Sequence, residues 1–180
     1  MTCIVAIAKE GKVWMGADSG GSDEEVDVIM PYIMPKVFIR NNYIIGYSGS
    51  FRFGKLLQYI FDLPPVPNSI NTSEKLDEFM NKVVMQSLKK QAKELELEKE
   101  EMDFDALIGV KGHIFEVSSD WCALESSLPY NVSGSGHKFA LGSLYTTEVW
   151  KDPQKRINVA LSAAAEYAMS VAPPFNILSI

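Results

Sequence analysis

The 180-residue chain contains 47% hydrophobic and 22% charged residues, which is ordinary usage for a globular domain. Its formal net charge is −6 and it has no long basic run, so the composition argues against partners such as nucleic acid or anionic lipid. A chain of this length buries enough apolar surface to fold as a single domain, residues 1–180, without a disulfide or a metal.

The cysteines, the histidines and the N-terminal segment bear on location and cofactors. Cys3 and Cys122 form neither a CxxC pair nor a Cys/His cluster, so we expect reduced thiols in an intracellular protein. His113 and His137 are too isolated to indicate a zinc site, and we expect neither a metal nor another cofactor. The apolar stretch 3–8 is too short for a signal peptide, and no run approaches membrane-spanning length. We therefore expect a cytoplasmic protein.

The first fifty residues have the pattern of two successive β-hairpins. The run 3–8 is apolar almost throughout, which is typical of a strand covered on both faces. The dipeptide Asn41-Asn42 between two apolar stretches is a tight hairpin signal. In chain order, the pattern predicts strands at 3–8 and 13–17 around a turn at 10–12, a polar loop from Ser19 to Val26, and strands at 36–40 and 43–47.

Helices and strands then follow in groups. Apolar residues at helical spacing predict a helix over 51–63, ended by Pro64-Pro65, and a second helix from Ser73. The far end of that second helix, 91–101, is almost wholly charged and is predicted to protrude or fray. The remaining predicted elements are strands at 106–110, 113–117, 121–124 and 130–133, helices at 138–150 and 153–170, and a closing strand at 176–180.

This order of elements indicates the fold class. Strands cluster with strands and helices with helices, whereas a βαβ fold would alternate them. Two sheets packed together, with a helix pair outside each, would cover every apolar face. The sequence therefore predicts an α+β fold, a four-layer α-β-β-α sandwich of two mainly antiparallel sheets.

Five short motifs occur in a fixed order along almost the whole chain. They are Thr2-Cys3-Ile4-Val5-Ala6, Gly16-Ala17-Asp18-Ser19, Lys36-Val37, Gly46-Tyr47-Ser48-Gly49 and Gly134-Ser135-Gly136. Each motif is weak alone, but their order and separations, beginning at residue two, are fairly specific. The pattern resembles the proteasome β-subunit superfamily, whose members are N-terminal-nucleophile hydrolases, and most closely its bacterial HslV-type branch. The resemblance implies the same sandwich fold.

Thr2 is the candidate nucleophile. A threonine hydroxyl is a poor nucleophile and needs a base within hydrogen-bonding reach. If Met1 is removed, the α-amine of Thr2 can serve, because its ordinary pKa is only about 8. Without the other motifs, a Met-Thr start would carry no meaning, since many proteins begin in this way.

The resemblance assigns roles to four further residues. Lys36 would place a positive charge near Thr2, and Asp18 would hold that ammonium group in position. The backbone N–H of Gly49 would stabilise the oxyanion, and Ser135 would help to move a proton. Taken singly, each has a plainer interpretation: a solvated strand-end lysine, a turn aspartate, a glycine that eases a turn, and a flexible loop serine.

The sequence departs from the family pattern in two places. Proteasome β-subunits carry an Asp and a Ser-Gly-Gly before the last strand, where this chain has Ser170-Val171-Ala172-Pro173-Pro174. The bacterial branch also lacks the full motif. The segment from Ser22 to Pro35 is long and acidic and lies where the family's substrate pocket begins, so cleavage preference cannot be transferred.

The resemblance implies a threonine endopeptidase that degrades unfolded polypeptide inside homo-oligomeric stacked rings, supplied by a separate ATP-dependent unfoldase. Two alternatives remain open. One is a non-catalytic ring subunit that only assembles, which retention of Met1 would favour. The other is a small-amide hydrolase of the wider superfamily. Cys3 is not a competing nucleophile, because it becomes N-terminal only after an additional cleavage.

Overall fold

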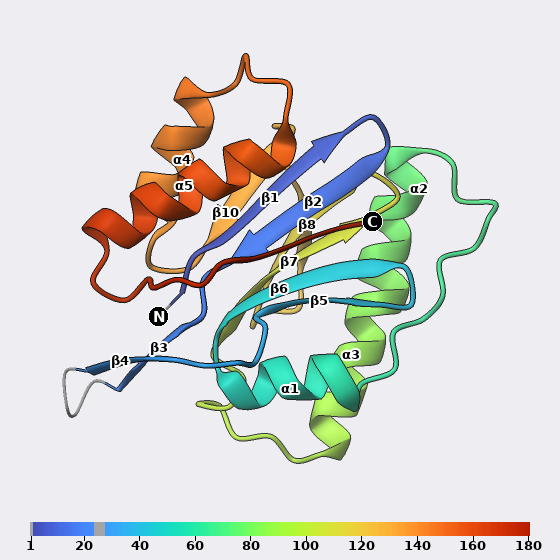
Figure 1. The fold of residues 1–180 in the computed structure, drawn as a ribbon. Coiled ribbons are helices and arrows are strands. Elements are labelled where there is room, and N and C mark those ends of the chain that lie inside the picture. The colour runs from blue at the N-terminus through green and yellow to red at the C-terminus, as the bar shows by residue number, and fades with distance from the viewer. Residues whose placement is uncertain (1, 24–27) are drawn as a thin grey trace.

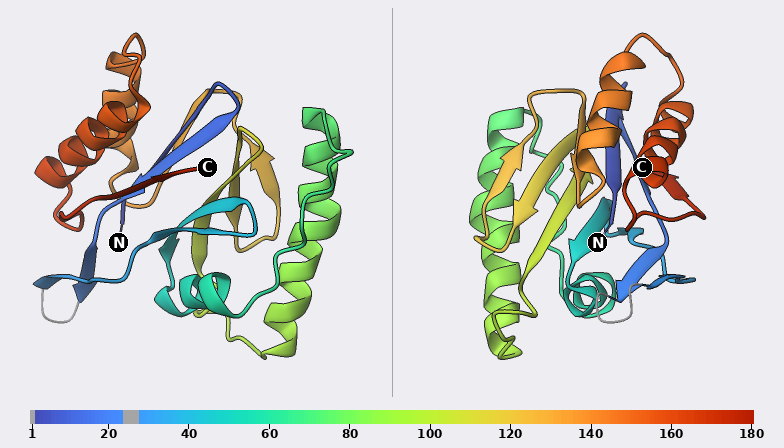
Figure 2. Two further views of the ribbon diagram at one scale, coloured as in Figure 1. Left: turned by 45° about the vertical axis from the view of Figure 1, so that its right-hand side comes forward. Right: turned by 90° about the vertical axis from the view of Figure 1, so that its left-hand side faces the viewer.

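The computed structural model describes residues 2–23 and 28–180. These residues form four layers, with two antiparallel sheets packed face to face and helices on both outer faces (Figures 1 and 2). The right-hand view of Figure 2 shows the green helices on one outer face and the orange and red helices on the other. The predicted α-β-β-α sandwich is confirmed.

The first sheet has the strand order β10-β1-β2-β11. Its strands are β10 (Tyr130–Ser133), β1 (Ile4–Lys9), β2 (Lys12–Ala17) and β11 (Asn176–Ser179). β1 lies in the interior of this sheet, because Val5 pairs with Val132 on one side and with Gly16 on the other. β1 is therefore flanked by the next strand of the chain, β2, and by β10, which is far away in the sequence.

The second sheet has the strand order β5-β6-β7-β8-β9. Its strands are β5 (Val37–Arg40), β6 (Tyr43–Gly49), β7 (Phe104–Val110), β8 (His113–Ser118) and β9 (Ala123–Glu125). The β5–β6 hairpin turns at Asn41 and Asn42, which have φ angles of 49° and 64°. Two successive residues with positive φ are what a tight type I′ hairpin turn requires, so the predicted Asn-Asn turn is confirmed.

The alternation of side chains explains why the β1 sequence is apolar throughout. Cys3, Val5 and Ile7 face the helices outside the first sheet, and Ile4 and Ala6 face the second sheet. Successive side chains of a strand point to opposite faces, and here both faces are covered. The prediction of a doubly covered strand is confirmed.

The helices begin at clear capping signals. The side chain of Ser50 caps α1, that of Thr72 caps α2, and that of Asp152 caps α5, which has Pro153 in its first turn. Helices α4 and α5 cover the first sheet, and the others cover the second (Figure 1). Their bounds are α1 (Phe51–Tyr59), α2 (Ser73–Phe79), a π-helical segment η1 (Met80–Val84), α3 (Met85–Glu94), α4 (His137–Thr146) and α5 (Pro153–Tyr167).

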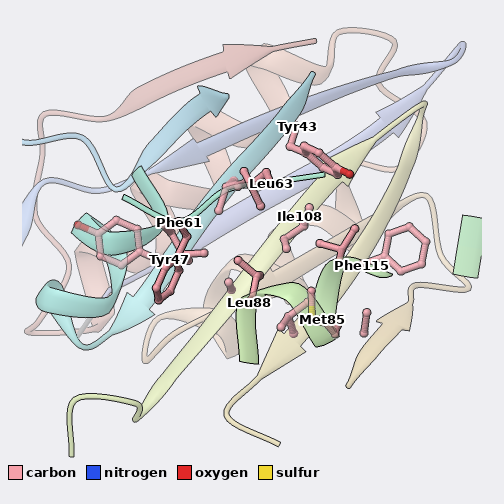
Figure 3. Close-up of a cluster of buried hydrophobic side chains, with 14 of the residues drawn as sticks. Tyr43, Tyr47, Phe61, Leu63, Met85, Leu88, Ile108 and Phe115 are labelled. Carbon is pink, nitrogen blue, oxygen red and sulfur yellow. The ribbon is translucent and has the colours of Figure 1, made fainter. Parts of the chain in front are cut away.

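The largest apolar cluster lies between the second sheet and helices α1 to α3. Figure 3 shows Tyr47, Phe61 and Leu88 meeting across this layer together with Ile108 and Phe115. Two smaller clusters fill the space between the sheets and the space under α4 and α5. Burial on this scale fixes the relative position of the two sheets. It therefore also fixes the edge of the sandwich at which the five sequence motifs meet.

Several predicted boundaries are corrected. The polar loop from Ser19 to Val26 contains strand β3 (Gly20–Asp23), which pairs with β4 (Val28–Pro31); residues 24–26 lie outside the described residues. Two glycines followed by polar residues have low strand propensity, and backbone pairing with β4 overrides it. A third hairpin thus joins the two predicted ones.

The predicted helices all end earlier than expected: α4 ends at Thr146 rather than at 150, and α5 ends at Tyr167 rather than at 170. α1 ends at Tyr59, and Phe61 and Leu63 leave the helix to enter the core. α3 ends at Glu94 because Leu97 turns back to be buried, so the charged stretch 91–101 is not one protruding helix. No helix in residues 2–23 and 28–180 has the length and apolar character needed to cross a membrane.

Candidate active site

Asp18 is a buried carboxylate that joins four segments of the chain. It lies just after β2, and its side chain has no exposed area. Its Oδ1 accepts hydrogen bonds from the backbone N–H of Cys3 at 2.9 Å and from Lys36 Nζ at 3.0 Å. Its Oδ2 accepts from the N–H of Gly20 at 2.9 Å and of Ala172 at 3.3 Å. These four donors give both oxygens of the buried carboxylate hydrogen-bond partners.

Lys36 supplies the opposite charge. It directly precedes β5, its side chain is only 2% exposed, and it also donates to the carbonyl of Gly20. Because Lys36 Nζ and the N–H of Cys3 share one oxygen of Asp18, the ammonium group lies beside the Thr2–Cys3 peptide. The plainer interpretation of Lys36 as a solvated strand-end lysine is wrong, because its side chain is buried. Asp18 does bind the N–H of Gly20 two residues on, as turn aspartates do, and it binds Lys36 as well.

Thr2 itself is buried at the edge of the sandwich and is held by the loop before α4. Its backbone nitrogen donates to Ser135 Oγ at 3.2 Å, and its carbonyl accepts from the N–H of Gly136 at 3.2 Å. Ser135 Oγ also contacts the Thr2 carbonyl at 3.3 Å and Ser170 Oγ at 2.8 Å. These contacts fit one arrangement in which Ser170 donates to Ser135 and Ser135 donates to the Thr2 carbonyl.

Gly134 allows this loop to approach Thr2. Its φ angle is +86°, and a Cβ atom at this position would lie 2.3 Å from the Thr2 carbonyl oxygen. Both observations exclude a larger residue. The two glycines of the Gly-Ser-Gly motif are therefore packed against Thr2 and Cys3, while Ser135 between them is exposed.

Thr2, Gly49 and Ser135 line one pocket of about 480 Å³ between the ends of the two sheets. Gly49 ends β6 with a φ angle of +83°, and a Cβ atom there would lie 2.4 Å from the Asp103 carbonyl oxygen. The other lining residues are Ser48, Asp105, Glu116, Val132, Ser133, Gly134 and His137. A pocket of this size can accept a peptide side chain beside Thr2.

The structure thus brings together all five predicted site residues. Thr2, Gly49 and Ser135 line the pocket, and Asp18 and Lys36 lie behind the Thr2–Cys3 peptide. Within residues 2–23 and 28–180, no group of three or more His, Cys, Asp or Glu side chains is placed to hold a metal ion.

The sequence did not single out Ser170. This residue is 5% exposed and lies in the segment where the family pattern is altered, yet its hydroxyl reaches Ser135. Two residues later, Ala172 binds Asp18 through its N–H and Ser19 through its carbonyl. The altered segment therefore supports both sides of the site. The available signal was a serine in the segment between α5 and β11.

Two other candidate nucleophile arrangements are not supported. Burial, followed by the charge of Asp18, raises the pKa of the Cys3 thiol to about 12, which disfavours the reactive thiolate. His137 Nδ1 lies 2.8 Å from the carbonyl oxygen of Gly134, so this ring nitrogen is engaged by backbone rather than by Ser135. A serine–histidine pair at this loop is therefore not formed through that nitrogen.

A pH-dependent contribution to stability follows from the burial of Lys36. Burial lowers the pKa of Lys36 from its ordinary 10.5, and Asp18 offsets only part of that shift. Between the lowered pKa and 10.5, the unfolded chain holds more protons at Lys36 than the folded chain does. The contribution of Lys36 to the free energy of unfolding should therefore rise with pH in that window.

The check is urea unfolding of the wild type and of Lys36→Met from about pH 7 to about pH 10. The stability of the wild type relative to the variant should increase as pH rises, because only the wild type carries the lysine. Titration of Tyr43 is common to both proteins and cancels, and Lys36 makes the smallest of the three contributions to the pKa of Cys3, so the titration of Cys3 largely cancels too. A difference that stays constant with pH would show that Lys36 keeps an ordinary pKa.

Several solved structures of other proteins share the architecture of this chain. No protein-family model matches the sequence, and no curated protein matches it. Among solved structures, BPH from Thiobacillus denitrificans in complex with epoxomicin is 21% identical, with a TM-score of 0.79 over 99% of this chain and 98% of that chain. Eukaryotic HslV from Trypanosoma brucei is 16% identical, with a TM-score of 0.70 over 99% and 98%.

A third match is Anbu, an ancestral beta-subunit from Yersinia bercovieri, which is 14% identical with a TM-score of 0.67 over 99% of this chain and 81% of that chain. All three alignments cover nearly the whole chain, so the shared architecture includes both sheets and all the helix layers. The chain has the proteasome-like fold of the N-terminal-nucleophile hydrolases, as the motif resemblance predicted.

Proposed function

We propose that the protein is a threonine endopeptidase that becomes active when the Met1–Thr2 bond is cleaved. One observation carries the proposal: Thr2 lines a pocket while its nitrogen is held by Ser135 and its peptide bond borders the Asp18–Lys36 pair. While Met1 is attached, the Thr2 nitrogen is an amide and cannot accept a proton. Cleavage converts the same nitrogen into an amine, which can.

The reaction begins with attack of Thr2 Oγ1 on the substrate carbonyl carbon as the amine of Thr2 takes the hydroxyl proton. Lys36 assists because a nearby positive charge favours the unprotonated amine and the developing alkoxide. The N–H of Gly49 is our candidate donor to the oxyanion, because Gly49 lines the same pocket.

The tetrahedral intermediate then breaks its carbon–nitrogen bond. The leaving nitrogen takes the proton from the Thr2 ammonium, which leaves an ester between Thr2 and the acyl part of the substrate. Water adds to this ester as the amine accepts a proton from it, and collapse returns that proton to Thr2 Oγ1. Ser135, which Ser170 orients, would hold the amine and pass protons between these positions.

We further propose that the chain assembles into homo-oligomeric rings that enclose the pocket and receive unfolded polypeptide from a separate ATP-dependent unfoldase. The surface carries large apolar side chains that such an assembly would bury. The most exposed of them are Ile33 (102%), Val149 (87%), Met169 (85%), Tyr145 (71%) and Tyr167 (70%).

The test uses purified protein in which intact mass has verified cleavage of the Met1–Thr2 bond. This protein is incubated separately with unfolded casein, with a stably folded protein and with simple amides. Unfolded casein should be cut into peptides, whereas a stably folded protein should remain intact. If the processed protein cuts neither casein nor simple amides, the assembly-only alternative replaces the proposal. If it cuts simple amides but not casein, the small-amide hydrolase alternative does.

A further inference from the structure

One wall of the Thr2 pocket is acidic. Asp105 on β7 and Glu116 on β8 are both exposed and both line this pocket. Asp105 is paired with Ser48 across β6 and β7, and the Ser48 hydroxyl contacts that of Ser133 in the other sheet at 3.4 Å. Directly paired residues point to the same face of a sheet, so Asp105 faces the first sheet.

Glu116 faces the same way. It pairs with Leu107, which is two residues after Asp105 and is packed in the core between the sheets. Side chains two residues apart on a strand share a face, so both carboxylates point into the space between the sheets. Ile114 and Leu107 fill that space deeper in, and the two acids stand where it opens as the pocket.

The pocket has little positive charge of its own to balance them. Among the described residues that line it, none is lysine or arginine, and the Nδ1 atom of its histidine contacts a backbone carbonyl. Glu116 Oε2 accepts a hydrogen bond from Asn131 at 3.3 Å, which orients the carboxylate without neutralising it.

The two carboxylates also influence one another. The pKa of Asp105 is raised, first by partial burial and then by the negative charges of Glu116 and Asp103. Bringing a cation between the acids would relieve this repulsion, and a neutral or acidic group would not. The electrostatics of the wall therefore favour a positively charged ligand.

We propose that this wall selects a lysine or arginine side chain of the substrate, adjacent to the bond that is cleaved. The proposal rests on the proposed peptidase function, since it assigns the residues that determine its specificity. A guanidinium or ammonium group between Asp105 and Glu116 would place the neighbouring peptide bond at the mouth of the pocket that Thr2 lines. Electrostatic complementarity of this kind acts mainly on substrate choice.

The experiment is a positional scan with a fluorogenic peptide library, read as kcat/KM for the processed wild type, Asp105→Asn, Glu116→Gln and the double variant. The wild type should prefer Lys or Arg at one position next to the cleaved bond. Each single variant should lower the ratio of kcat/KM for basic peptides to kcat/KM for neutral peptides by about tenfold. Raising the salt concentration should weaken the preference.

Glu166→Gln is the matched control, because it makes the same change in charge at an exposed position on α5 that does not line the pocket. It should keep the preference of the wild type. If neutral peptides are cleaved as well as basic ones, or if the double variant keeps the basic preference, this inference is overturned and the peptidase proposal survives. If no peptide in the library is cleaved, the peptidase proposal itself fails.

Discussion

Replacing Thr2 with alanine should lower kcat/KM for peptide hydrolysis by about a thousandfold or more, to the background of the assay. The variant still has an N-terminal amine once Met1 is removed, and Asp18 and Lys36 remain in place. It lacks the oxygen that would attack the substrate, together with the methyl group on the same carbon. Alanine is smaller than threonine at this buried position, so the fold should persist. Peptide turnover and circular dichroism measured on the same preparation check both expectations.

Thr2→Ser is the matched control for this variant. Serine retains the attacking oxygen and the α-amine but loses the methyl group that restricts the side chain to few rotamers. It should therefore keep measurable turnover, far above that of Thr2→Ala. If alanine and serine variants are equally inactive while both are folded, the hydroxyl of residue 2 is not the decisive group.

Asp18→Asn should lower the free energy of unfolding by about 3–5 kcal/mol at neutral pH. The change leaves the ammonium group of Lys36 buried without an opposite charge. It also turns one acceptor oxygen into an NH₂ group that faces backbone donors, either Cys3 N–H on one side or those of Gly20 and Ala172 on the other. Urea unfolding followed by tryptophan fluorescence measures the loss.

The double variant Asp18→Asn/Lys36→Met separates the two causes. Removing the lysine from the asparagine variant should restore part of the lost stability, because the unpaired buried charge is then gone. A loss below about 1 kcal/mol in Asp18→Asn, or no recovery in the double variant, would mean that the pair lies in a more solvated environment than its burial indicates.

Much of the fold could be predicted because the local signals agree with the tertiary structure. The run 3–8 is apolar on both faces because β1 is covered on both faces, and Asn41-Asn42 supports the positive φ angles of its hairpin. Strand β3 was missed because Gly20 and Gly21 carry no strand signal, and its pairing with β4 is a backbone property. Helix ends were misplaced where apolar residues keep the helical spacing beyond the end of the helix. Phe61 is an example, because it lies after α1 and is buried in the core.

The site could be predicted only in part. The motif order identified all five predicted residues: Thr2, Asp18, Lys36, Gly49 and Ser135. The contact of Thr2 with Ser135 spans 133 residues, so the family resemblance implied it and no local pattern encodes it. Ser170 was missed because its segment was compared with a family motif that it does not match. Its contact with Ser135 depends on the position of the chain after α5, which tertiary packing determines. The acidic wall depends likewise on the register of β7 and β8.

The central claim is that residue 2 supplies both the attacking oxygen and the proton-accepting nitrogen. A peptide epoxyketone tests it directly, because its ketone reacts with a hydroxyl and its epoxide with a neighbouring amine, and epoxomicin is already bound in one of the matching structures. Intact mass and peptide mapping should show one adduct, on Thr2, in processed protein alone, with slower formation in Lys36→Met. An adduct on protein that retains Met1, or none on protein whose Thr2 amine is free, would contradict the claim.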